Sequence, residues 1–314
     1  CFSRKYFKNL LNSSNLIDMM KYLVIAITLI TSSYLHADDI DTAKKNVLSR
    51  FTNSITSSLE EVLGGKGDTE IKIAAGEDYK PEFSILTVRP LAAHEGVDAW
   101  FVQFQLNDTK IRGKSRIALN SGLGYRKLSK SKTSFIGGNF FIDYDAEGNA
   151  RASLGTELRS SAFEAIANYY IGLSDAKTVG AYSERVLDGA EISLIGELPG
   201  LPWASIVANH YEWQADKNAQ NSKGDKISLE LTLTPNLIVE AGFDDNNIHG
   251  SSNFVKASLV YPARERIAAT TQLVGTTVFS KDNMSNELLS KVRRTNKQII
   301  ESEGTGIVIA RTSE

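Results

Sequence analysis

The sequence predicts an all-β protein: a twelve-stranded antiparallel transmembrane β-barrel that follows a short N-terminal periplasmic helix. Three observations predict it. Apolar side chains recur at every second position over long stretches, which is the repeat of a β-strand. Turn residues interrupt these stretches at intervals, and an export signal precedes them. The 314 residues carry a net charge of −2, so the charge balance gives no indication of nucleic-acid binding.

The first 37 residues are expected to be absent from the mature protein. Residues 19–37 have the plan of a signal peptide: a lysine, an apolar run over 22–30 and a polar stretch that ends in Ala37. The alternative is a membrane helix, but the apolar run is only about half of the ~20 residues that a span requires. Residues 1–18 are then expected to be a non-native leader. Cys1 is the only cysteine, so the mature chain would contain none, which fits export in a bacterium.

Residues 38–66 are predicted to form a periplasmic helical segment. Apolar residues there are spaced three, four or seven apart and form one stripe: Ile40, Val47, Phe51, Ile55, Leu59 and Val62. Gly64 and Gly65 supply a helix end. A helix that packs against other parts of the protein is the expectation.

The clearest strand pattern lies in residues 135–161. Even positions there are mainly apolar, odd positions carry charges, glycine and small polar groups, and a short turn at 145–149 divides the stretch into a hairpin. Ten further segments follow the same rule. With the two strands of the hairpin they give twelve candidate strands: 71–74, 83–91, 100–107, 116–126, 136–145, 150–159, 163–173, 190–198, 203–213, 226–233, 237–244 and 255–261. Most approach the ~9–11 residues that a tilted strand needs to cross a bilayer. An even number of strands is typical of single-chain bacterial barrels.

The connections between the candidate strands alternate, imperfectly, between longer and shorter. The longer set includes 75–82, 107–114, 174–185 and 214–225, and the shorter set includes 160–162, 199–202 and 235–236. Outer-membrane barrels have long extracellular loops and short periplasmic turns. The pattern therefore favours an N-terminus on the periplasmic side.

A soluble β-sandwich is the alternative, since its strands also alternate and are joined by turns. Sandwich strands are usually shorter, ~5–6 residues. The polar face here is rich in glycine, serine, asparagine and charges of both signs, as a barrel lumen would be. We therefore favour a barrel whose apolar face meets hydrocarbon, and closure is required because an open edge is not tolerated in lipid.

The pattern assigns residues to the two faces of this wall. The predicted lumen-facing residues are Arg116, Asn120, Arg126, Asn139, Asp143, Arg151, Glu157, Arg159, Glu164, Glu191, Glu197, His210, Glu212, Glu230, Glu240 and Lys256. Most of them are expected to solvate and brace a polar interior by pairing across strands. Aromatic residues near strand ends predict the girdles at the membrane interfaces: Tyr125, Tyr144, Trp203, Trp213 and Tyr261.

Four stretches resemble a known family: LNSGLGYRKL (119–128), FIGGNFFIDYDAEGNARASLGTELRSSAFEAIANYYIGLSD (135–175), LDGAEISLIGELPGLPWASIVANHYEW (187–213) and LTPNLIVEAGFD (233–244). They are similar to the inverse-autotransporter β-domain, the translocator of intimin and invasin, in family order over residues 46–261. The resemblance implies a twelve-stranded barrel of the bacterial outer membrane and the type Ve secretion route.

The resemblance also implies a C-terminal segment that returns through the lumen and carries an adhesive passenger to the cell surface. Residues 287–300 are similar to the family's post-barrel linker, so Arg293, Arg294 and Asn296 become linker candidates that some lumen-facing charges would hold. The domains expected are thus a barrel over 67–261 and a lumen-crossing linker or stub over 262–314. Only 53 residues follow Tyr261, fewer than one immunoglobulin-like domain of ~100 residues, so either the chain is cut short at Glu314 or the barrel carries a stub.

Two functions follow, a translocator and a plain outer-membrane barrel that acts as a small pore or structural protein. Neither is an enzyme: there is no G-x-S-x-G, H-E-x-x-H or P-loop motif. Outside the signal, His94, His210 and His249 lack ligand spacing, so no metal or cofactor is expected. The expected partners are outer-membrane lipid and the export and barrel-assembly machinery, with periplasmic or cell-wall contact through the N-terminal helix and no nucleic acid.

Overall fold

The computed structural model describes residues 67–76, 79–111, 114–217, 220–261, 267–302 and 306–308. The predicted leader, signal peptide and helix of 38–66 lie outside these residues. The chain divides into two compact units, Cys1–Gly65 and Lys66–Glu314, and all described residues belong to the second.

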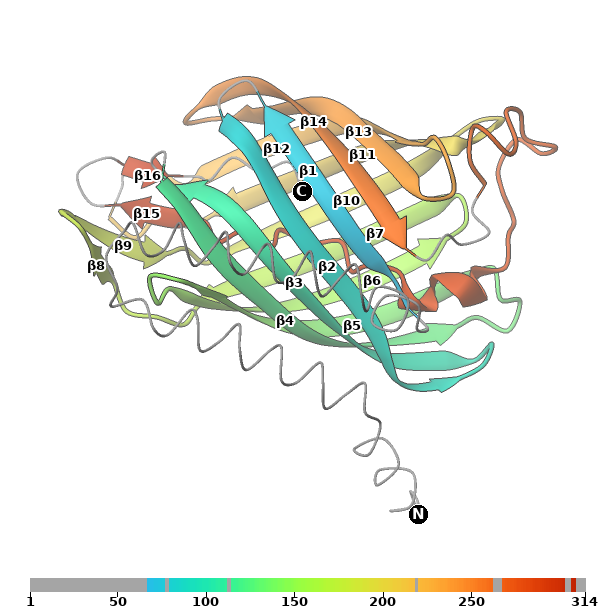
Figure 1. The fold of residues 1–314 in the computed structure, drawn as a ribbon, viewed down its shortest axis with the longest axis horizontal. Helices are drawn as coiled ribbons and strands as arrows, with labels where there is room; N and C mark the ends of the chain where they lie inside the picture. Colours follow the sequence, from blue (N-terminus) through green and yellow to red (C-terminus); the bar gives the residue numbers. More distant parts are fainter. Residues whose placement is uncertain are drawn as a thin grey trace, which may run out of the picture. The chain divides into compact units, whose positions relative to one another are not determined.

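Twelve strands form one closed barrel, in the order β1-β14-β13-β12-β11-β10-β7-β6-β5-β4-β3-β2, so the predicted fold class is confirmed (Figure 1). The strands are β1 (Thr69–Gly76), β2 (Tyr79–His94), β3 (Asp98–Ile111), β4 (Lys114–Leu128), β5 (Ser134–Asp145), β6 (Ala150–Ser160), β7 (Phe163–Gly172), β10 (Gly189–Leu198), β11 (Leu201–Trp213), β12 (Ser222–Thr232), β13 (Leu237–Asn246) and β14 (Gly250–Tyr261). Closure comes from β1 and β14, which pair antiparallel from Thr69↔Tyr261 to Gly76↔Phe254.

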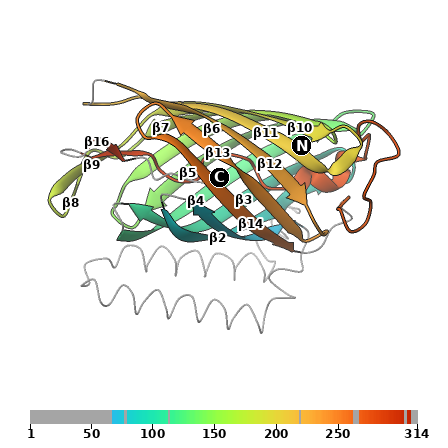
Figure 2. The same ribbon diagram turned by 90° about the horizontal axis from the view of Figure 1, so that it is seen from above.

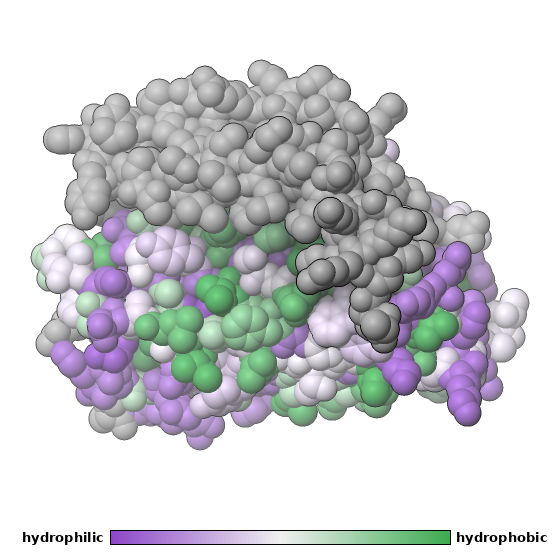
Figure 3. Space-filling model, turned by 90° about the horizontal axis from the view of Figure 1, so that it is seen from below, coloured by the Kyte–Doolittle hydropathy of each residue, from purple (hydrophilic) through white to green (hydrophobic). Residues whose placement is uncertain are grey.

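The wall separates an apolar outside from a polar inside, as the alternation predicts. In β5 the exposed side chains Ile136, Phe140 and Ile142 point outward, while Phe141 and Asp143, at the alternate positions, are fully buried. On the face seen in Figure 3, hydrophobic residues gather across the middle of the wall and hydrophilic residues gather toward its two ends. Among the described residues, none of the helices has the length and apolar character that a membrane span requires.

The two ends of the barrel differ, and each is named here by its connections. The turn end carries the start of β1, the end of β14 and short connections such as 161–162 and 199–200. The loop end carries the connections 146–149, 173–188, 214–221 and 247–249. Two predicted long loops are wrong, because β2, β3 and β4 continue through them and leave only 77–78 and 112–113 as connections at the loop end.

A second, four-stranded sheet lies at the loop end, in the order β16-β15-β9-β8. Its strands β8 (Lys177–Val179) and β9 (Tyr182–Val186) form a hairpin inside the connection that the sequence suggested was all loop. Its other two strands, β15 (Ile300–Ser302) and β16 (Gly306–Val308), belong to the segment after the barrel. A short 3-10 helix, η1 (Met284–Leu289), precedes them. Figure 2 shows β8, β9 and β16 at one end of the barrel and the helix at the other.

Candidate functional site: the occupied lumen

The segment after β14 crosses the turn end before it enters the barrel. The backbone N–H of Ala269 donates to the carbonyl of Thr232, and the N–H of Gly200 donates to the carbonyl of Val278. At the entrance the N–H of Met284 donates to the carbonyl of Lys132, in the β4–β5 turn. Residues 284–302, called the linker from here on, then run inside the barrel to the loop end (Figures 1 and 2).

Helix η1 fills the entrance at the turn end. Asn283 caps it by accepting a hydrogen bond from the N–H of Ser285. Met284 and Leu288 are buried in a cluster with Ala99, Leu128 and Phe135 of the wall. Helix η1 thus packs its apolar side chains against apolar residues of β3, β4 and β5 that point into the lumen at the turn end.

Arg126 of β4 holds the backbone where the helix ends. Its side chain is fully buried, pairs with Glu157 at 2.6 Å and lies over the ring of Phe101 at 4.5 Å. Its guanidinium also donates to the linker carbonyls of Leu288 at 3.0 Å and Ser290 at 2.5 Å. A guanidinium carries five N–H donors in a fixed plane, which suits a group of converging carbonyl oxygens.

Arg293 of the linker reaches wall carboxylates on two sides. Its guanidinium donates to both oxygens of Glu230 on β12, at 2.9 and 2.8 Å, and to Glu164 on β7 at 3.0 Å. Glu164 in turn accepts from Arg159 of β6 at 2.9 Å. The bidentate geometry with Glu230 is the strong arrangement for an arginine–carboxylate pair.

Arg294 makes the most buried ion pair of the linker. It donates to both oxygens of Asp143 on β5, at 3.0 and 2.6 Å, and both side chains have no exposed surface. It also donates to Ser153 at 3.1 Å and lies over the ring of Phe141 at 4.4 Å. Asp143 is shared with Arg151 of β6 at 2.7 Å, so one carboxylate faces two guanidinium groups.

The next linker residue contacts β7 and β10, which lie two and three strands from β5 around the barrel. The N–H of Thr295 donates to Tyr170 of β7 at 2.8 Å and to Glu191 of β10 at 2.9 Å, and its hydroxyl donates to Glu191 at 2.6 Å. The carbonyl of Thr295 accepts from Arg151 at 2.6 Å. Asn120 of β4 donates to the carbonyl of Asn296 at 2.8 Å. The chain is therefore bonded from several directions at one level of the lumen.

The linker leaves the lumen at the loop end. Lys297 pairs with Glu82 of β2, and Ile299 packs among Tyr170, Tyr211 and Trp213. Ile300 then begins β15, which pairs antiparallel with β9. Glu301 accepts from the backbone N–H groups of residues 216 and 217 at 2.7 and 2.9 Å.

Two kinds of contact hold the linker. Arg126, Asn120 and Arg151 bond its backbone carbonyls, and these contacts do not depend on the linker side chains. The side chains of Arg293 and Arg294 instead form ion pairs, which require wall carboxylates at the same level along the lumen. The first kind would accept other sequences, and the second kind fixes which segment rests in the lumen.

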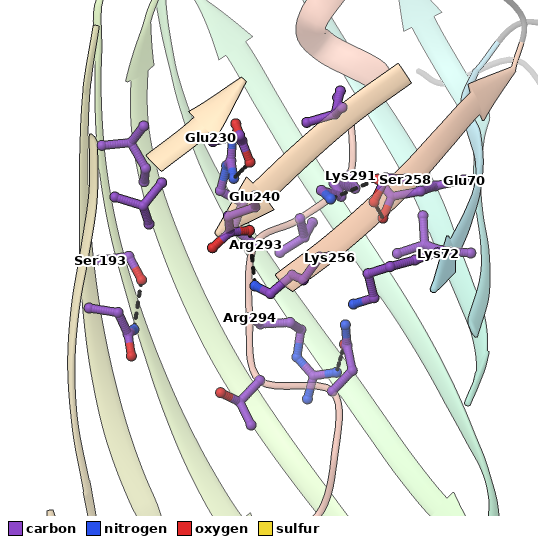
Figure 4. A pocket seen from close by; sticks show the side chains of 18 of the residues that line it. Glu70, Lys72, Ser193, Glu230, Glu240, Lys256, Ser258, Lys291, Arg293 and Arg294 are labelled. Carbon is purple, nitrogen blue, oxygen red and sulfur yellow. Dashed lines mark hydrogen bonds and ion pairs between the residues drawn. The ribbon is translucent and has the colours of Figure 1, made fainter. Parts of the chain in front are cut away.

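The linker does not fill the lumen evenly. A cavity of about 80 Å³ remains on the side of β1 and β10–β14. Figure 4 shows Lys72, Glu240 and Lys256 directed into this space, with Arg293 and Arg294 of the linker along its edge. The polar residues of that wall are therefore only partly engaged by the linker.

Most of the predicted lumen-facing residues lie on the inner surface. Buried there are Arg116, Asn120, Arg126, Asn139, Asp143, Arg151, Glu157, Arg159, Glu191, Glu197 and Lys256, and Glu164, Glu230 and Glu240 are partly buried. Arg116 pairs with Asp145 at 3.0 Å and with Glu184 of β9 at 2.7 Å. The structure brings the linker candidates Arg294 and Asn296 together by a hydrogen bond of 2.7 Å.

The predictions for β11 are wrong at three positions. His210 pairs in register with the exposed Ile192, and Glu212 pairs with the exposed Ala190, so both point outward. Trp213 is 2% exposed and lies inside, where its ring centroid is 5.1 Å from that of Tyr170. Residues paired across strands share a face, so β10 fixes the direction of β11. The other girdle residues, Tyr125, Tyr144, Trp203 and Tyr261, are partly or largely exposed near strand ends.

Several residues that hold the linker were not predicted. Gln103 accepts from the N–H of Val292 at 2.7 Å, and Asn168 donates to the carbonyl of Arg293 at 3.0 Å. Glu70 accepts from Lys291 at 2.7 Å. All three are polar residues in strands where polar and apolar residues alternate, so the alternation could have indicated that they face the lumen. In the part of the chain that the structure describes, no group of three or more histidine, cysteine or acidic residues is arranged to hold a metal ion.

Comparison with known proteins gives a family-model match described as "Inverse autotransporter, beta-domain" over residues 27–296. A solved structure described as "Unveiling the Mechanism Behind the in-meso Crystallization of Membrane Proteins" is 20% identical, covers 76% of this chain and 99% of that chain, and has a TM-score of 0.64. The KdgM porin is 7% identical over 61% of this chain and 98% of its own, with a TM-score of 0.42. The translocator domain of autotransporter NalP from Neisseria meningitidis is 8% identical over 71% and 97%, with a TM-score of 0.35. None of the curated proteins compared with this chain matches it.

Proposed function

Because this chain belongs to the inverse autotransporter β-domain family, we propose that its barrel exports a C-terminal segment through the lumen and then anchors that segment at the cell surface. The chain is a translocator-type β-barrel of the bacterial outer membrane. The proposal concerns the direction of export, the exported segment and its adhesive role.

One observation carries the proposal: the linker lies in the lumen from the turn end to the loop end and is bonded along its whole path. Its entrance contact is the apolar packing of Met284 and Leu288, and its exit contact is the pairing of β15 with β9. Between them, Arg293 and Arg294 are paired with carboxylates of the wall. A segment left outside the barrel would make none of these contacts.

The direction of export follows from the two ends of the barrel. Outer-membrane barrels place short turns in the periplasm and longer loops outside. The turn end, where the linker enters, is then periplasmic, and the loop end, where β15 and β16 pair with β9, faces the exterior. The C-terminus would be delivered outward. An adhesive passenger beyond it remains part of the proposal, as do the barrel-assembly machinery, lipid and cell-wall partners.

The second candidate, a plain pore, is favoured by the cavity beside the linker. That cavity is small, whereas the linker places fully buried charged pairs across the middle of the lumen. We therefore expect low conductance in planar bilayers. Conductance should rise when Arg293 and Arg294 are both changed to glutamate, because each would then face wall carboxylates of the same charge.

Epitope staining of intact cells tests the direction of export. One tag follows Glu314. A control tag replaces the turn at 248–249 between β13 and β14, at the loop end of the barrel. Staining of both tags without permeabilisation is the expected result, since both would lie outside.

The other outcomes separate the two functions. If only the turn tag is stained, the barrel is inserted but its C-terminus stays in the periplasm, and the translocator proposal is wrong. If neither is stained although the protein migrates as a folded barrel before heating, the assigned orientation is reversed. Permeabilised cells provide the control for the presence of each tag.

A further inference from the structure

We propose that the cavity beside the linker binds a small inorganic anion of about the size of chloride, held between Lys72 of β1 and Lys256 of β14. This inference does not rest on the export function, because it concerns only the folded barrel with its linker in place.

The cavity is polar and large enough for an ion with some water. Its volume of about 80 Å³ exceeds the ~10–15 Å³ that one water needs on the same measure. Six cationic and four anionic side chains line it: Lys72, Lys226, Lys256, Lys291, Arg293, Arg294, Glu70, Glu191, Glu230 and Glu240. Cations are thus in excess on its surface.

Nearly all of these cations already have carboxylate partners. Lys291 pairs with Glu70 at 2.7 Å, and Lys256 pairs with Glu240 at 2.9 Å. Lys226 lies 3.6 Å from Asp244. Arg293 and Arg294 pair with Glu230 and Asp143 as described above.

The carboxylate of Glu191 does not offset the excess at the cavity. It accepts from Thr295, Tyr170 and Asn168, which are neutral donors. Asp143 faces two guanidinium groups, those of Arg151 and Arg294, so one positive charge is left over there. The negative charge of Glu191 balances it. The charges at that level of the lumen therefore sum to neutrality without help from the cavity.

Lys72 is the exception. Within the part of the chain that the structure describes, its ammonium makes no ion pair within 4.0 Å and no hydrogen bond. The carboxylates beside it on the wall, Glu70 and Glu82, are taken by Lys291 and Lys297 of the linker. Figure 4 shows Lys72 reaching into the same space as Lys256, without a dashed line to any neighbour.

An anion is the ligand that this arrangement favours. Two ammonium groups that share one cavity repel each other, and an anion between them converts the repulsion into two attractions. A cation would meet the same excess of positive charge and be rejected. Ser258 pairs in register with Lys72 on the same face, but its hydroxyl donates to Glu70 at 3.3 Å, so the two ammonium groups are the donors left for the anion.

Chloride-35 NMR of the refolded full chain in a zwitterionic detergent tests the site. Bound chloride that exchanges with bulk chloride broadens the signal. The wild type should therefore show an excess line width that saturates as chloride is added and that falls when bromide displaces the bound chloride. Sodium gluconate keeps the ionic strength constant. Lys72→Met keeps the aliphatic stem and should reduce the excess at least about fivefold.

Lys223→Met is the matched control, because Lys223 lies exposed on the outer face of β12. It should leave the excess line width unchanged. Lys72→Arg keeps the charge and should retain most of the broadening. If Lys72→Met and Lys223→Met give the wild-type signal, the anion is elsewhere and the proposal fails. An absence of saturable broadening in the wild type also overturns it. Heat-modifiable migration verifies that each variant is folded.

Discussion

Replacing Arg294 by methionine should loosen the linker in the lumen while the barrel stays intact. Arg294 and Asp143 are joined by two hydrogen bonds and have no exposed surface. Methionine keeps the length and apolar contact of the side chain against Phe141 but removes the guanidinium. The change therefore acts on the ion pair and its hydrogen bonds.

The magnitude follows from what Asp143 retains. Removing one partner of a buried ion pair costs roughly 3–5 kcal/mol when the other charge is left uncompensated. Here Asp143 keeps Arg151 at 2.7 Å and accepts from Asn120 at 2.7 Å, so its charge stays paired. The loss is then closer to that of hydrogen bonds to a charged group, about 1.5–3 kcal/mol.

Hydrogen exchange of linker amides measures this free energy. The N–H groups of Val292 and Thr295 are bonded to wall side chains and exchange only when the linker opens. A loss of about 1.5–3 kcal/mol predicts exchange about 10- to 150-fold faster in peptides covering 291–299. Peptides from β12 and β13 should exchange at the wild-type rate.

Arg185→Met provides the control, because Arg185 also pairs with a carboxylate, Asp216, but both side chains are largely exposed. Exposed pairs contribute little, so linker exchange should change by less than about threefold. The reasoning is refuted if Arg294→Met exchanges like the wild type. It is also refuted if exchange accelerates equally around the whole barrel, because Arg294 would then stabilise the wall rather than the linker.

Three further substitutions and one control can be tested. Asp143→Asn should speed linker exchange more than Arg294→Met, because it leaves the Arg151 and Arg294 guanidinium groups facing each other, at a cost of roughly 3–5 kcal/mol; equal effects would contradict this. Gly124→Ala should lower the midpoint of heat-induced unfolding in a gel-shift assay, since a Cβ there would lie 2.2 Å from a ring atom of Phe101, an overpacking that costs about 1–3 kcal/mol. Gly196→Ala, which meets open space, should leave the midpoint unchanged. Glu301→Gln should make the 214–221 connection easier to cleave with protease by at least about threefold, because Glu301 accepts from two backbone N–H groups there.

The wall of the barrel was predictable because one physical rule governs every strand. A side chain at every second position must suit lipid, and the intervening ones must suit a polar interior. Phe141 shows where the rule is incomplete: it is apolar but lies on the inner face, against Val292 of the linker. Its partner is 151 positions away along the chain, so no local pattern could have indicated that contact.

The errors in β11 have the same origin. Tyr211 and Trp213 are inside because they pack on Ile299 of the linker, whereas His210 and Glu212 point outward near the loop end. The sequence pattern assigned the aromatic residues to lipid by their type. Gly189 carried a better signal, because a Cβ there would lie 2.2 Å from the Trp213 ring, but its use requires the register between β10 and β11.

The passage of the linker through a closed ring has a mechanical consequence. A pull on the chain beyond β16 first opens the pairing of β16 with β15 and then the pairing of β15 with β9, each of which has three residue pairs that can separate one after another. The force then runs along the lumen axis, where the bonds of Arg293, Arg294 and Thr295 cross that axis and are strained together. Helix η1, packed at the opposite opening, must unravel or be drawn inward before the chain can leave. The contacts inside the lumen thus resist an outward pull on the linker, and the strands in the membrane need not unfold to bear that force.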